Sequence, residues 1–296
     1  RGAAAAVAAG LLCFLVAGGK AFRDWRGESQ RFEKLRMSAR PVIAEYQSQL
    51  SRLSLSTALR DRIASDETHY LDGLLPDAAQ DQELGRQLAT AYGSLAYHQT
   101  NATAAQDSLL KAMSLWRGIA PKQLTPADQL EKAKAARRLG WSQINMGKLT
   151  DARRSLEDGL RCLDALAGTS SAGAGRLERV GLFFELSRLG AWAGQGDQAI
   201  GFAQKAVAEH EKLPPQPLDR RGIAMTRMQL ADAADTYGSA NPTLYEEALR
   251  QARLAVKAVR EAPSCEELPC REVKAAVLAR APAVLVHHGL VQEALS

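Results

Sequence analysis

Small residues recur along this sequence at intervals of about 47 residues, and this recurrence constrains the fold more than any other feature. Alanine occupies the same place near the start of five similar segments, at Ala105, Ala152, Ala199, Ala248 and Ala294. A second small residue follows seven positions later in the first four of them, as Ala112, Gly159, Ala206 and Ala255. Helices that cross closely need small side chains where they touch, so the pattern predicts an array of helical hairpins.

The clearest unit spans residues 130–162 and has the spacings of a tetratricopeptide repeat. Gly140, Ala152 and Gly159 supply the small positions of a helix crossing. Leu139 and Leu156 fill the space between the helices, and Gly147 makes the turn; both follow from residue size and backbone freedom. The predicted fold is therefore an all-α, tetratricopeptide-like solenoid of four to five repeats over residues 81–296. Residues 21–80 are expected to form a helical linker with a degenerate first hairpin around Ala58.

Helix-start signals and composition agree with an all-helical chain. Proline follows a capping residue at Thr125-Pro126 and at Asn241-Pro242, as at the first turn of a helix. The 53 alanines favour helix, and the 5% of aromatic residues is low for a β-sandwich. No long segment alternates between apolar and polar residues, so no strand is predicted.

An uncharged run, Gly2–Gly19, precedes the repeats. As a helix, its 18 residues would be about 27 Å long, close to the hydrocarbon thickness of a bilayer. The favoured interpretation is a transmembrane helix over residues 1–20, which makes the protein single-pass. A signal peptide cleaved after Ala17-Gly18-Gly19 and an alanine-rich buried helix are the alternatives. Seven basic residues between Lys20 and Arg40 would place the following flank in the cytoplasm by the positive-inside rule.

The linker and first repeat resemble the corresponding region of bacterial transmembrane serine/threonine protein kinases with C-terminal tetratricopeptide repeats. The matching pieces are Arg31-Phe32 with Leu35-Arg36, Tyr70-Leu71-Asp72, and residues 87–92, QLATAY. The resemblance implies a kinase upstream in the cytoplasm and an extracytoplasmic repeat region. Members of the family carry the same basic flank after their membrane span, so the positive-inside rule has less weight for this chain. The chain departs from the family at Tyr97–Thr103, which lacks the usual Gly-Asp turn and predicts a looser first repeat.

The sequence carries no recognisable catalytic, cofactor-binding or metal-binding motif, including those of protein kinases. Its net charge of +5 comes from 38 basic and 33 acidic residues, a mixed surface that does not indicate nucleic-acid binding. Cys265 and Cys270 are spaced for a disulfide in an oxidising compartment, or are two free thiols otherwise. Cys162 lies at an apolar-face position and is expected in the core.

The first helix of each predicted hairpin would face a groove able to hold a partner. The repeat phase assigns nine residues to that side: Tyr97, His98, Lys134, Arg137, Trp141, Asn145, Phe184, Arg188 and Trp192. Basic and amide groups among aromatic rings would suit a protein or peptide partner that carries carboxylates. The alternative is that the tryptophans pack between neighbouring repeats and that the basic residues are solvated.

Three functions remain open on this basis. The leading hypothesis is an interaction or sensor module, tethered by the membrane span to an upstream signalling domain, a serine/threonine kinase by resemblance. In this hypothesis the array binds a partner. Homodimerisation, or a rearrangement across the span, would then change the activity of the kinase. The alternatives are the repeat region of a membrane-bound transcription regulator and a stand-alone membrane-anchored scaffold.

Overall fold

The computed structural model describes residues 57–166, 168, 172–213, 219–237, 241–261, 268–287 and 289–290. The hairpins all belong to one compact unit that begins at Arg60. The transmembrane helix predicted over residues 1–20 lies outside the described residues. None of the described helices combines the length and apolar character needed to cross a membrane.

In the described ranges the regular elements are all helical, which confirms the predicted all-α class. A short 3-10 turn, Pro121–Gln123, lies between α5 and α6. The α-helices in chain order are α3 (Thr57–Ala78), α4 (Gln82–His98), α5 (Ala102–Gly118), α6 (Pro126–Asn145), α7 (Leu149–Asp164), α8 (Ala172–Trp192), α9 (Gly196–Glu211), α10 (Asp219–Tyr237), α11 (Pro242–Arg260) and α12 (Leu268–His287).

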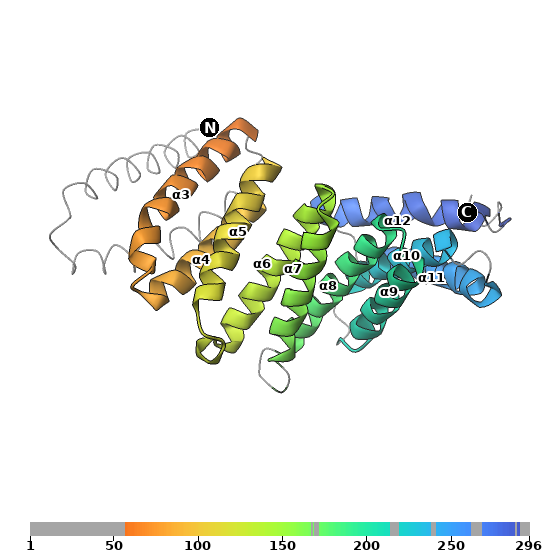
Figure 1. Cartoon of the computed structure of the whole chain (residues 1–296). Helices are drawn as coiled ribbons and strands as arrows, with labels where there is room; N and C mark the ends of the chain where they lie inside the picture. The colour runs from red at the N-terminus through yellow and green to blue at the C-terminus, as the bar shows by residue number, and fades with distance from the viewer. Residues whose placement is uncertain are drawn as a thin grey trace. The chain divides into compact units, whose positions relative to one another are not determined.

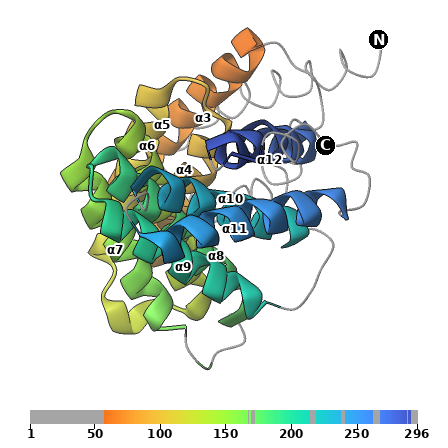
Figure 2. The same cartoon turned by 90° about the vertical axis from the view of Figure 1, so that its right-hand side faces the viewer.

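Consecutive helices pair as hairpins, α4 with α5, α6 with α7, α8 with α9, and α10 with α11. The hairpins follow one another in chain order (Figure 1). The first helix of each hairpin also contacts the first helix of the next one, from α4 through α6 and α8 to α10, and α10 in turn contacts α12. Figure 2 shows α12 beside α10 and α11 at the blue end of the row. The first helices therefore form one continuous layer of the array.

A glycine turn joins the two helices within the α6–α7 hairpin, and another does the same within the α8–α9 hairpin. Gly147 has φ +73° and Gly194 has φ +67°, a left-handed conformation that suits glycine. The amide of Gly147 donates to the carbonyl of Ile144 at 2.9 Å, and that of Gly194 donates to the carbonyl of Ala191 at 3.1 Å. The α4–α5 turn contains no glycine. Asn101 fixes the start of α5 instead, because its side-chain oxygen accepts a hydrogen bond from the amide of Ala104.

The predicted small positions lie where the helices cross. A Cβ atom added to Gly140 would come within 2.5 Å of two atoms of the Leu156 side chain. One added to Gly159 would lie 2.8 Å from Leu182. Ala152 and Ala199 are fully buried. Larger residues at these points would push the helices apart, since close-packed interiors have no room to absorb them.

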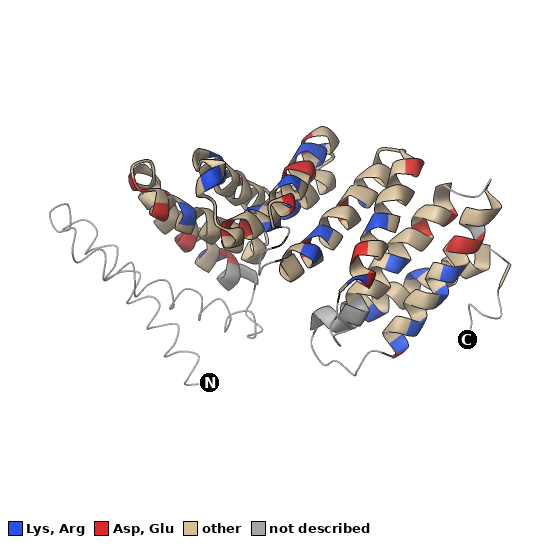
Figure 3. Ribbon diagram, turned by 90° about the horizontal axis from the view of Figure 1, so that it is seen from below, with Lys and Arg blue, Asp and Glu red and all other residues tan. Residues whose placement is uncertain are grey.

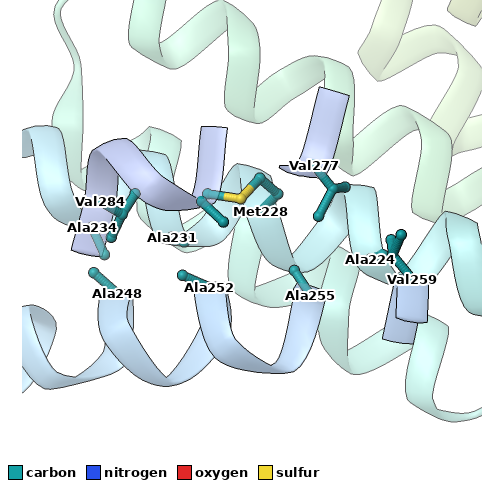
Figure 4. Close-up of a cluster of buried hydrophobic side chains, with 11 residues drawn as sticks. Ala224, Met228, Ala231, Ala234, Ala248, Ala252, Ala255, Val259, Val277 and Val284 are labelled. Atoms are coloured by element: carbon teal, nitrogen blue, oxygen red, sulfur yellow. The ribbon is translucent and has the colours of Figure 1, made fainter. Parts of the chain in front are cut away.

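Alanine dominates the core formed by α10, α11 and α12. Figure 4 shows alanines of α10 and α11 facing one another, with α12 valines at the same cluster. The buried members are Ala224, Met228, Ala231, Ala234, Ala248, Ala252, Ala255, Val259, Val277, Ala281 and Val284. Small side chains let helix backbones approach closely, so much of the alanine content serves close helix packing.

The start of α6 provides a test of local stability. Thr125 accepts from the amide of Asp128 at 3.2 Å, and Asp128 accepts from the amide of Thr125 at 2.8 Å, which completes a capping box. We expect Thr125→Ala to lower the free energy of unfolding by about 1 kcal/mol, because it leaves the amide of Asp128 without its acceptor. Urea denaturation measures this change. Thr150→Ala, at an exposed position of α7, is the control and should change it by less than about 0.5 kcal/mol.

Candidate functional site

The nine residues assigned to the groove come from three consecutive first helices, and we call them the first-helix face. Tyr97 and His98 end α4, and Phe184, Arg188 and Trp192 lie in the second half of α8. The remaining four, Lys134, Arg137, Trp141 and Asn145, lie on α6. His98, Asn145 and Trp192 are the last residues of their helices, so they occupy equivalent positions of successive hairpins. The face thus repeats at the same end of each first helix.

Three large aromatic side chains of this face are open to solvent. Tyr97 is 69% exposed, Trp141 is 49% exposed and Trp192 is 61% exposed. By contrast, Trp116 on α5 is 0% exposed and belongs to the core between hairpins. Trp141 and Trp192 are therefore not buried between neighbouring repeats, the alternative role that the sequence left open for them.

Polar contacts join the first-helix face across hairpins. Arg188 of α8 donates to the Asn145 side-chain oxygen of α6 at 3.3 Å, and it also pairs with Glu185 at 2.8 Å. Arg137 of α6 forms an ion pair with Glu178 of α8. Arg137 lies close over Gly181, where an added Cβ would come within 2.8 Å of its Cδ. Helices α6 and α8 are thus joined at two places along their length, in each case by an arginine side chain.

Most basic groups of the face are already matched by carboxylates. Lys134 pairs with Glu131 at 2.8 Å, besides the Arg137–Glu178 and Arg188–Glu185 pairs. Glu185 is buried, and burial raises the pKa of its carboxyl despite the nearby arginines. Basic and acidic residues are also interspersed along the helices in Figure 3. A simple attraction between a basic groove and an acidic partner is therefore weaker than the sequence suggested.

Arg138 belongs with this face, although the repeat phase did not select it. Its Nη1 donates to the carbonyl of Gly93 on α4 at 2.6 Å, and its guanidinium lies 5.2 Å from the ring centroid of Tyr97. Burial, followed by repulsion from Arg137, lowers the pKa of Arg138. The sequence shows that a second basic residue, Arg138, follows Arg137. That its side chain reaches α4 depends on the rotation of α6 about its axis, which the sequence does not give.

His98 stands beside the same arginine. Its ring lies edge-on to that of Tyr97, with the centroids 5.3 Å apart. Burial and then the charge of Arg138 lower the pKa of His98, so the neutral imidazole predominates at pH 7. A neutral imidazole supplies one N–H donor without adding charge.

The other chemical candidates from the sequence give no second site in the described part of the chain. Cys265 and the Cys270 side chain lie outside what the structure describes, so their predicted disulfide stays a prediction. Cys162 is buried, as expected for a core position. No three His, Cys, Asp or Glu residues gather as a metal site among the described residues.

No family model matches the chain, and no curated protein matches its sequence. Among solved structures, the chain is similar to BtubC (BKLC) from P. vanneervenii, with a TM-score of 0.58 and 12% sequence identity. The match covers 79% of this chain and 86% of that chain. At this identity the likeness shows a shared helical fold alone.

Proposed function

We propose that residues 81–296 are a tetratricopeptide-like interaction module that binds an extended segment of a partner protein on the first-helix face. The observation that carries the proposal is the exposure of Tyr97, Trp141 and Trp192 on three consecutive first helices. Large aromatic side chains supply much of the binding energy at protein interfaces, and they are costly to leave in water. A repeat array offers such side chains at regular spacing along an extended partner.

We also propose that the module acts as a sensor, tethered by a membrane span at residues 1–20 to an upstream signalling domain. The kinase identity of that domain rests on the resemblance of Arg31-Phe32, Tyr70-Leu71-Asp72 and residues 87–92 to transmembrane serine/threonine kinases. The coding sequence upstream of Arg1 tests it. A glycine-rich loop with H-R-D and D-F-G motifs is expected there, whereas a winged helix would favour the transcription regulator.

Binding by the first-helix face is tested with peptides selected by the full 296-residue chain from a random twelve-residue phage library. We expect Trp141→Ala and Trp192→Ala each to weaken a selected peptide by about tenfold or more, as for interface hot spots. Isothermal titration calorimetry measures the affinity.

Leu110→Ala is the matched control, because Leu110 is a 43% exposed apolar residue on the second helix α5. It should change the affinity by less than about twofold. The proposal is wrong if Leu110→Ala weakens binding as much as the tryptophan variants do. It is equally wrong if the library yields no peptide that binds the chain better than an unrelated protein.

A further inference from the structure

The charges of the first-helix face are balanced except at Arg138. Lys134, Arg137 and Arg188 each form an ion pair with a carboxylate. Within the described residues, Arg138 forms no ion pair, and its one hydrogen bond goes to the Gly93 carbonyl. Its guanidinium is partly removed from water at that place. Glu131 and Glu178 act on it only over a distance, so a partly buried guanidinium without a direct ion pair can still gain one from a partner.

The surroundings of Arg138 leave it able to receive an anion. A guanidinium has five N–H donors in a planar fork, and the Gly93 carbonyl uses one of them. The ring of Tyr97 lies 5.2 Å from the guanidinium and is itself well exposed to solvent. His98, next to Tyr97, can add one neutral donor. Trp141 follows Arg138 by three residues on α6, so it lies on the neighbouring surface of the helix.

We propose that Arg138, with Tyr97 and His98, binds a side-chain carboxylate of the partner segment, and that Trp141 holds an adjacent apolar residue. We call these four residues the Arg138 site. The inference rests on the proposed function and adds the chemistry of the partner: an extended peptide with Asp or Glu beside an apolar residue. The planar fork of arginine matches a carboxylate through two parallel hydrogen bonds.

The local charge favours a single negative charge over a phosphate. Glu131 and Glu178 both act electrostatically on Arg138. A phosphate group carries a charge of about −1.5 to −2 at pH 7, so these two carboxylates would repel it more than they repel a carboxylate. Among the described residues Arg138 forms no direct ion pair, so its guanidinium can pair with one carboxylate of a partner.

The test compares Arg138→Gln, Arg138→Lys and the control Arg154→Gln in the full chain. Arg154 is an exposed arginine of α7 that pairs with Asp151 only at 4.0 Å, so its variant removes the same charge away from the face. The probes are library-selected peptides and their Glu→Gln and Glu→phosphoserine forms. Affinities are measured by calorimetry, and thermal melting shows whether each variant is folded.

We expect Arg138→Gln to weaken the selected peptides by about tenfold or more, the loss typical of a charge-assisted hydrogen bond. Arg138→Lys should retain part of the affinity, and Arg154→Gln should stay within about twofold of wild type. The Gln form of the peptide should bind wild type and Arg138→Gln equally weakly, because neither complex can form the ion pair between Arg138 and a carboxylate.

Separate outcomes distinguish a failure of this site from a failure of the proposed function. If Trp141→Ala weakens the peptides but Arg138→Gln does not, the face binds partners and the Arg138 site is wrong. If the phosphoserine form binds wild type more tightly than the glutamate form, the assignment to a carboxylate is wrong. If no library peptide binds above an unrelated protein, both proposals fail.

Discussion

Gly190→Ala is expected to lower the free energy of unfolding by about 2 kcal/mol. The added Cβ would lie 2.8 Å from the backbone nitrogen of Ala199 and 3.1 Å from its Cα, so α8 and α9 must separate. Overpacking costs about 1–3 kcal/mol, and we expect the upper end because the obstacle is backbone; the better helix propensity of alanine offsets about 1 kcal/mol, which leaves a loss of about 2 kcal/mol. Because the obstacle is backbone, no side-chain rotation can relieve it. Urea denaturation followed by circular dichroism measures the change.

Gly201→Ala is the matched control for this experiment. Gly201 lies inside α9, and an added Cβ there would meet nothing within 4 Å. Alanine should therefore stabilise the protein by about 0.5–1 kcal/mol through helix propensity alone. Opposite signs for the two substitutions would support close crossing of α8 and α9. A loss at both positions, or at neither, would contradict the hairpin packing described above.

The second large effect is expected from Arg137→Ala. Glu178 is buried on α8, and the guanidinium of Arg137 is its partner from the preceding hairpin. Removing the arginine leaves a buried carboxylate without its counter-charge, which costs about 3–5 kcal/mol in fully buried pairs. Because Arg137 is still partly exposed, we expect a loss near the lower end, about 3 kcal/mol, in urea denaturation.

A double variant separates the ion pair from other effects of Arg137. Replacing both members by apolar residues, Arg137→Met with Glu178→Leu, removes the buried charge as well as its partner. That variant should lose less stability than Arg137→Ala alone. Arg154→Ala removes an exposed arginine of α7 and should cost less than about 0.5 kcal/mol. If Arg137→Ala costs no more than this control, the pair does not hold the two hairpins together.

The residues that could be predicted from the sequence are those whose role depends on size and spacing along the chain. Gly140 and Gly159 are required by close helix crossings, and Gly147 by a left-handed turn. Thr125 and Asn241 cap helices through contacts within three residues. All of these constraints are local or repeat with the hairpin period, so the sequence pattern carries them.

The chemistry of the face was less accessible to prediction, because it depends on contacts between hairpins. Arg137 and Glu178 are 41 residues apart, and Arg138 and Gly93 are 45 residues apart. Which arginine meets a carboxylate and which meets a carbonyl follows from the rotation of each helix about its axis. The spacing of apolar residues leaves that rotation uncertain by a residue or more. Arg138 was missed for this reason, while its neighbour Arg137 was included.

The most direct test of partner binding by the first-helix face is ¹⁹F NMR of the full chain labelled with 5-fluorotryptophan. Trp141 and Trp192 are exposed on the face, and Trp116 is buried elsewhere in the array, so one spectrum contains both the probes and their control. Single Trp→Phe variants assign the resonances. On addition of a library-selected peptide, the resonances of Trp141 and Trp192 should shift, and that of Trp116 should not. Binding that leaves both exposed tryptophans unshifted would contradict the proposal.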